Sequence, residues 1–130
     1  MRRLPLLFAV MMMCSASPLA QDLPTGRSSH RFWDKPNQAL FLTHVALESA
    51  DFAITHHNLS NGGRELNPMG KALCESGTPG QITFFAGRSV GVAAVSYLFH
   101  KTGHHKLERA FMVVASVDSA YGVTYSFAHR

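Results

Sequence analysis

Three segments of this chain combine long apolar stretches with a few polar residues at helical spacing. The first covers residues 37–58 and places His44, Glu48, Asp51 and Thr55 at intervals of 4, 3 and 4 residues, which is one stripe of a helix surface. Leucine, phenylalanine, valine and isoleucine occupy much of the remaining surface. A water-soluble helix has the opposite proportion, so the pattern favours a helix with lipid outside and protein partners inside.

The other two segments, 81–100 and 107–129, are equally apolar. The second segment has Arg88 as its one charged residue, and the third has Asp118 in its middle. With a rise of ~1.5 Å per residue, each of the three could cross a hydrocarbon layer of ~30 Å. A lone charge in hydrocarbon costs several kcal/mol, so we expect Arg88 to pair with Asp51, Glu48 or Asp118 in an internal charge cluster.

The connections between these segments predict a three-helix bundle with one additional short helix. Gly62 and Gly63 stop the first helix, and Asn67 and Pro68 offer a cap and a first-turn proline for a short helix that continues to residue 75. Residues 77–80 (GTPG) are expected to end it. The short 101–106 connection predicts that the second and third long helices are antiparallel neighbours.

The N-terminal residues have the anatomy of a signal peptide, with a basic start, a short apolar stretch and a small-residue exit over 1–20. Residues 21–36 mix proline, glycine, serine and charges and predict a linker, which leaves 37–130 as the helical membrane domain. Cleavage would put the mature N-terminus outside, whereas the distribution of lysine and arginine prefers the opposite orientation. The orientation therefore stays open.

Composition narrows the class of protein. Charged residues make up 15% of the 130 residues, against roughly 25% in a typical soluble domain, and the length allows one domain. The net charge of +4 comes from scattered basic residues that never form a run, so nucleic-acid binding is not expected. Cys14 lies in the predicted signal peptide and leaves Cys74 alone, which excludes an intrachain disulfide in the mature chain.

The polar stripe of the first helix supports two interpretations. His44, Glu48 and Asp51 share a helix face and could hold a divalent metal, since imidazole and carboxylate are ligands for zinc, iron or manganese. The same groups could instead hydrogen-bond between helices and neutralise Arg88, which is the interpretation we favour. The histidine pairs 56–57 and 104–105 are expected at solvated or interfacial positions, because sequence neighbours point to different helix faces.

A short pattern links the first helix to the loop that follows it. Asp51 and Thr55, followed by Gly62-Gly63-Arg64-Glu65-Leu66-Asn67-Pro68, resemble the D-x-x-x-T and G-x-x-E-x-N-P pattern of an uncharacterised family of small bacterial multi-pass membrane proteins. The resemblance covers the first helix through this loop, about a quarter of the chain. It implies a multi-helix membrane fold with Asp51, Glu65, Asn67 and Pro68 as signature positions, and it implies no substrate.

These observations predict a small protein of the cell inner membrane, structural or an interaction or assembly subunit rather than an enzyme, and without a required cofactor. Gly87 and Gly91 form a G-x-x-x-G pair through which a partner helix could approach closely. One alternative is an intramembrane metal-dependent enzyme that uses His44, Glu48 and Asp51. Another is a soluble periplasmic helical bundle whose solvent face is the polar stripe.

Overall fold

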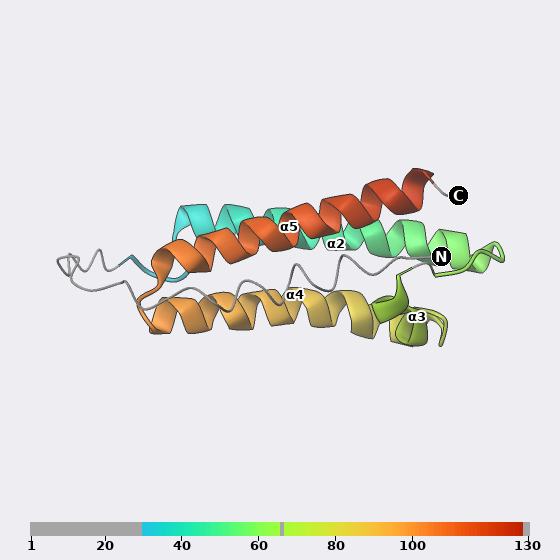
Figure 1. The fold of residues 1–130 in the computed structure, drawn as a ribbon, viewed down its shortest axis with the longest axis horizontal. Helices are drawn as coiled ribbons and strands as arrows, with labels where there is room; N and C mark the ends of the chain where they lie inside the picture. Colours follow the sequence, from blue (N-terminus) through green and yellow to red (C-terminus); the bar gives the residue numbers. More distant parts are fainter. Residues whose placement is uncertain (1–29, 66, 129–130) are drawn as a thin grey trace, which may run out of the picture.

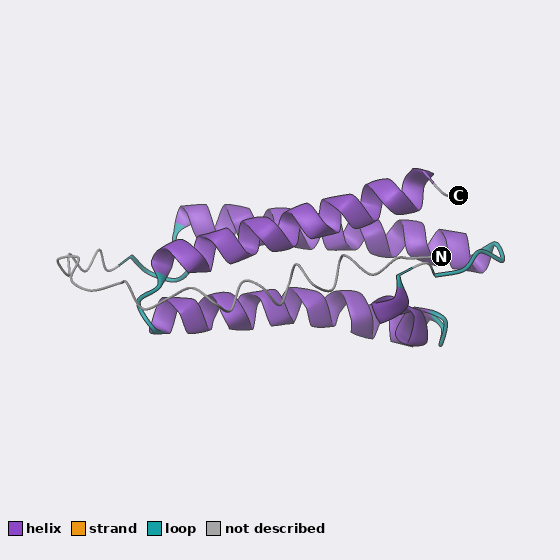
Figure 2. Cartoon of the chain, in the orientation of Figure 1, coloured by secondary structure: helices purple, strands orange, loops and turns teal. Residues whose placement is uncertain are grey.

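Three long helices and one short helix make up almost all of the chain that the computed structural model describes, residues 30–65 and 67–128 (Figure 2). The predicted all-α fold is therefore confirmed. The predicted signal peptide lies outside the described residues, as does the first part of the predicted linker. In chain order the helices are α2 (Lys35–Ser60), α3 (Pro68–Cys74), α4 (Thr78–Lys101) and α5 (His105–Ala128).

The helix starts follow local capping rules. Asp34 Oδ1 accepts a hydrogen bond of 3.0 Å from the Asn37 backbone N–H at the start of α2. Asn67 Oδ1 accepts one of 3.0 Å from the Met69 N–H at the start of α3, where Pro68 is the first helical residue as predicted. α4 begins three residues earlier than expected, because proline is tolerated in a first helical turn where its missing N–H is not needed.

Consecutive long helices run in opposite directions and lie side by side (Figure 1). α2 packs against both α4 and α5, which also contact each other, while α3 packs against α4. A tight turn connects α4 to α5, and Gly103 adopts a left-handed conformation there with a φ of 78°. The predicted antiparallel pairing of these two helices is confirmed.

Most of the buried residues of the bundle are polar, and many of its large apolar side chains are exposed. Among the described residues, buried polar or charged residues outnumber buried hydrophobic residues by nine to four. The four hydrophobic residues are Cys74, Phe85, Val92 and Met112, whereas fourteen large hydrophobic residues are exposed. The predicted stripe of α2 lies inside this interior: its buried residues are Asn37, His44, Glu48, Asp51 and Thr55.

Of the described helices, α4 alone is both long and apolar enough to cross a membrane by length and composition. Only 17% of its most apolar window is buried inside the bundle, so α4 is not the buried core helix of the fold. α2 and α5 are also long enough, but they do not meet the same criterion of composition. The prediction of three membrane-spanning helices therefore finds support by this criterion for one of them.

Candidate functional site

Halfway along the bundle, polar side chains from all three long helices meet. We call His44, Glu48, Arg88, Asp118 and Ser119 the central polar layer. Ser119 Oγ on α5 lies 2.5 Å from Glu48 Oε1 and 3.4 Å from His44 Nδ1, both on α2. Their helical spacing of four residues puts His44 and Glu48 on the same face, and α5 supplies the hydroxyl between them.

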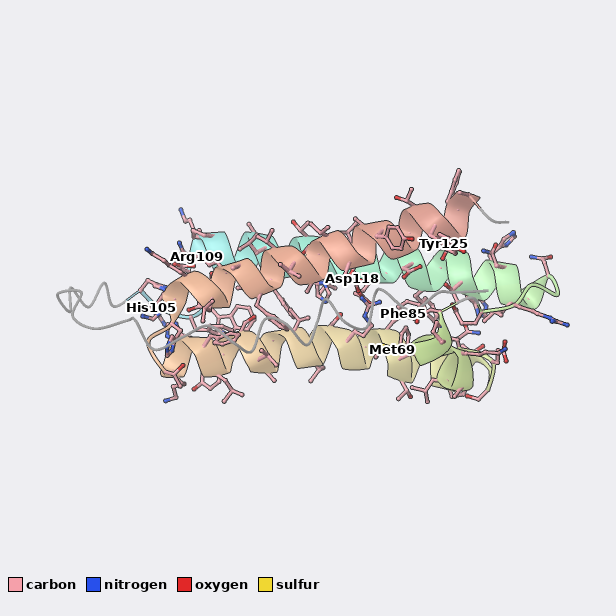
Figure 3. All side chains as sticks on the ribbon, viewed as in Figure 1. Met69, Phe85, His105, Arg109, Asp118 and Tyr125 are labelled. Carbon is pink, nitrogen blue, oxygen red and sulfur yellow. The ribbon has the colours of Figure 1, made fainter. Side chains whose placement is uncertain are left out.

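Arg88 closes this layer from α4. Its guanidinium lies 3.3 Å from Glu48 Oε1 and 2.5 Å from Asp118 Oδ2, so it bridges α2 and α5. The expectation that Arg88 pairs with acidic residues of the other helices is met by Glu48 and Asp118. The Asp118 side chain is 69% exposed, however, and lies at the rim, because its neighbour Ser119 occupies the inward position of α5 (Figure 3).

Asp51 and Thr55 continue the buried stripe toward the end of α2. Asp51 Oδ1 accepts a hydrogen bond of 3.4 Å from Ser126 Oγ on α5. Gly122 lets the two helices approach here, since a Cβ on this residue would lie 2.6 Å from Asp51 Oδ2. Arg88 forms no ion pair with Asp51 within the described part of the chain. Asp51 therefore joins α2 to α5 separately from the central polar layer.

The loop that precedes α3 has a structural role. Glu65 Oε1 accepts a hydrogen bond of 2.8 Å from the Asn67 N–H, so Glu65 orders the residue that caps α3. Cys74, at the other end of α3, is 1% exposed. Burial, together with the nearby charge of Glu65, raises the pKa of the Cys74 thiol to about 11. Asn67 and Pro68 act as the predicted cap and first-turn proline.

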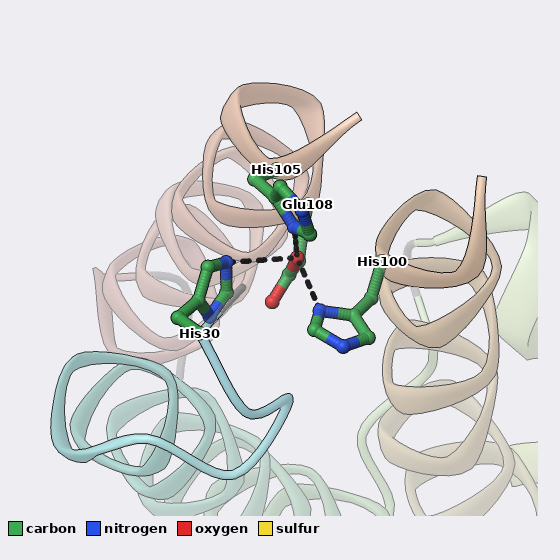
Figure 4. A group of neighbouring side chains, drawn as sticks. All are labelled: His30, His100, His105 and Glu108. Atoms are coloured by element: carbon green, nitrogen blue, oxygen red, sulfur yellow. Dashed lines mark hydrogen bonds and ion pairs between the residues drawn. The ribbon is translucent and has the colours of Figure 1, made fainter. Parts of the chain in front are cut away.

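A second polar centre lies at the end of the bundle where α4 turns into α5. We call His30, His100, His105 and Glu108 the turn-end cluster (Figure 4). The Nδ1 atoms of His100 and His105 each lie 3.1 Å from Glu108 Oε2, and His30 Nε2 lies 3.7 Å from the same oxygen. Glu108 is fully buried. One carboxylate oxygen is thus surrounded by three imidazoles from three different segments.

Outer residues hold the turn-end cluster in place. The Asn37 amide donates to Glu108 Oε1, and Arg109 Nε donates to Asn37 Oδ1 at 3.2 Å. Asp34 Oδ2 lies 3.1 Å from His30 Nδ1 and 2.7 Å from Arg109 Nη2. The hydrogen bond from the Asn37 N–H, together with the charges of Arg109 and His30, keeps the pKa of Asp34 below its usual value.

The turn-end cluster was not predicted from the sequence. His30 lies in the predicted linker, and the pair His104 and His105 was expected at solvated or interfacial positions. The structure separates this pair: His104 is exposed and lies 3.0 Å from Thr102 Oγ1, whereas His105 reaches Glu108 one turn along α5. The spacing of His105 and Glu108 was a usable signal, but no local pattern reveals the contribution of His30.

The candidate metal ligands on α2 are arranged differently. Glu48 Oε1 is engaged by Ser119 and Arg88, and Asp51 Oδ1 by Ser126. His44 Nε2 and Glu48 Oε2 are buried and have no hydrogen-bond partner among the described residues. In the same part of the chain, the turn-end cluster is the one group of histidine, cysteine or acidic side chains whose ligand atoms all lie within 4.8 Å of one another.

Gly87 and Gly91 lie on the outer surface of α4. A Cβ built on either glycine meets nothing within 4 Å in the described structure, so the bundle itself does not use this G-x-x-x-G pair. The pair stays a prediction for contact with another helix.

The chain matches no protein-family model, no curated protein and no solved structure. The resemblance based on Asp51, Thr55 and residues 62–68 therefore stays a prediction.

Proposed function

We propose that this chain is a small inner-membrane protein whose three long helices lie in a bilayer, and that it serves as a structural or interaction subunit rather than an enzyme. One observation carries the proposal. Among the described residues, the buried positions of the bundle are mostly polar and many large apolar side chains are exposed, which is the reverse of a water-soluble bundle.

The exposed apolar side chains are concentrated on the long helices. Val90 is 67% exposed in the middle of α4, and Val117 is 64% exposed in the middle of α5. Burying a side chain of this kind is worth ~1.5–3 kcal/mol relative to exposing it to water. In water, the bundle would lose this burial free energy at many positions. A bilayer would supply apolar surroundings for the same side chains without any change of fold.

The low mean hydropathy of α2 and α5 is compatible with a bilayer. A hydropathy average counts every residue of a helix, but lipid contacts only its outer surface. Part of the polarity of α2 and α5 comes from residues that are buried between helices, such as His44, Glu48 and Ser119. Each long helix has at least 24 residues, which corresponds to roughly 36 Å and exceeds the ~30 Å hydrocarbon layer.

The central polar layer supports a structural role over catalysis. Arg88 contacts Glu48 and Asp118 directly, and Ser119 fills the space between Glu48 and His44. Charged groups that pair with one another between helices avoid the cost of an uncompensated charge in an apolar medium. An intramembrane enzyme built on His44, Glu48 and Asp51 would instead need these groups to face a shared space that admits a substrate.

Carbonate extraction of membranes from cells that express the full chain tests the proposal. We expect the chain to stay in the pellet with integral membrane proteins, and a peripheral protein should appear in the wash as an internal control. Release of the chain with that control would overturn the membrane proposal and favour the soluble periplasmic bundle. Separate fractionation of the inner and outer membranes then tests the location.

A further inference from the structure

We propose that the turn-end cluster is a binding site for a divalent transition metal, with Zn²⁺ as the best fit, in which His30, His100, His105 and Glu108 are the four ligands. This inference goes beyond the membrane proposal and does not depend on it, because it rests on the geometry of four side chains at one end of the bundle.

The distances between the ligand atoms suit a small metal ion. A tetrahedral site with metal–ligand bonds of ~2.1 Å places its ligand atoms about 3.4 Å apart. Two histidine nitrogens lie 3.1 Å from Glu108 Oε2 and the third lies 3.7 Å away. All four ligand atoms lie within 4.8 Å of one another, so an ion between them requires only small movements of side chains.

The composition of the cluster favours a borderline transition metal. Three imidazoles and one carboxylate form a set that zinc binds in proteins, whereas calcium and magnesium prefer oxygen ligands. Glu108 has 0% relative exposure and brings a negative charge into the bundle. Imidazole binds a metal in its neutral form, so a bound dication would compensate the charge of this carboxylate.

The outer residues provide the support that metal sites require. Metal-binding histidines usually donate their second ring N–H to a carboxylate or carbonyl, which fixes the ring. His30 has this arrangement: Nδ1 lies 3.1 Å from Asp34 Oδ2, and buried Nε2 faces the cluster without a hydrogen-bond partner among the described residues. Asn37 in turn holds Glu108 through Oε1, which leaves Oε2 toward the three histidines.

The site would join three segments of the chain. His30 precedes α2, His100 lies in the last turn of α4 and His105 begins α5, so one ion would connect the α4–α5 turn to the start of α2. Four protein ligands leave no position for substrate in a tetrahedral site, which is the arrangement of structural rather than catalytic zinc. We therefore infer a metal that stabilises this end of the bundle.

Metal titration of the full chain tests this inference. The protein would be purified in detergent with a tag that contains no histidine, stripped with a chelator and titrated with Zn²⁺ against a chromophoric competitor. Co²⁺ would report tetrahedral coordination through its visible absorption. We expect one Zn²⁺ per chain, and at least a tenfold loss of affinity in His100→Gln and in His30→Ala.

Matched variants separate the turn-end cluster from other histidines. His104→Gln removes an exposed histidine beside the cluster and should keep full affinity. His44→Gln changes the α2 stripe and should also keep it. If His44→Gln abolishes binding while His100→Gln retains it, the metal belongs to the α2 stripe and this inference is wrong.

Loss of binding is informative only if the variant is folded, so folding is measured for each variant. His30 precedes α2, so His30→Ala should retain the helical circular dichroism and the elution volume of the wild type. Zn²⁺ should raise the unfolding temperature of the wild type and of His104→Gln, but not that of His30→Ala. Absence of stoichiometric Zn²⁺ or Co²⁺ binding by the folded wild type would overturn the inference, even if carbonate extraction confirms the membrane location.

Discussion

Lysine substitutions in the middle of the apolar surface distinguish a bilayer from water. Val117 lies near the midpoint of α5 and is 64% exposed, so lysine can replace it without entering the packed interior. Each end of α5 is about 12 residues away, or roughly 18 Å, which exceeds the reach of a lysine side chain. The new charge would therefore stay at the level of the hydrocarbon centre.

The free-energy cost of this substitution depends on whether the side chain is surrounded by lipid or by water. On insertion scales, the change from valine to lysine at the centre of a membrane helix costs about 3 kcal/mol, which is more than a hundredfold in the insertion equilibrium. The same change on a water-exposed surface is usually within about 0.5 kcal/mol of neutral. The expected cost of the lysine substitution is therefore several times larger in a bilayer than in water.

The assay is the fraction of chain that resists carbonate extraction, measured at equal expression level for wild type, Val117→Lys and Val90→Lys. Both lysine variants should lose membrane-resistant protein, and Val117→Leu should behave as the wild type. Met69→Lys is the matched control, because Met69 is 85% exposed on α3, outside the long helices. Unchanged fractions for both lysine variants would refute the placement of α4 and α5 in a bilayer.

Further predictions concern packing, the thiol and the metal. Arg88→Gln leaves the buried Glu48 carboxylate without its cation and should destabilise the folded chain by about 3 kcal/mol in thermal unfolding, with partial recovery in Arg88→Lys. Gly80→Ala should lower the free energy of unfolding by about 1–3 kcal/mol, because the new Cβ would lie 2.0 Å from the Leu73 carbonyl oxygen. Gly87→Ala should not lower it, because a Cβ there meets nothing within 4 Å. With a folded-state pKa of about 11 against a usual value of 9.0, the Cys74 thiol must stay protonated in the fold, so stability should fall as pH rises from 9 to 11 and Cys74→Ala should lose that dependence. Maleimide should modify Cys74 slowly in native protein and quickly after unfolding; equal rates would contradict its burial. Asp34→Asn keeps a capping side chain but removes the carboxylate beside His30, and should weaken Zn²⁺ binding by about 10–100-fold without loss of helix content.

Most of the fold could be predicted from local sequence. The three long helices, the short helix and the antiparallel pairing of α4 and α5 all follow from periodicity, caps and loop length. The start of α4 was placed three residues too late because residues 77–80 were interpreted as a turn. Gly77 ends the preceding segment, and Pro79 belongs to the first turn of the helix, which local composition alone does not distinguish.

The interior of the bundle was only partly predictable. The spacing of His44, Glu48, Asp51 and Thr55 indicates one helix face, and low charge content indicates that this face is inward. Which acid pairs with Arg88 depends on how far each helix is rotated. The observed rotation of α5 puts Ser119 inside and Asp118 at the rim. A rotation of α5 by one residue would put Asp118 inside instead.

The chain's own pattern thus determines which segments are helical and which face of α2 is polar, because both depend on contacts between residues three or four apart. In the turn-end cluster, His100 and His105 are close to Glu108 in sequence, but His30 is more than 70 positions away from it. No local periodicity encodes the contact of His30 with Glu108, since it requires the segment before α2 to fold back against the α4–α5 turn. Only the tertiary structure brings the third histidine to this carboxylate.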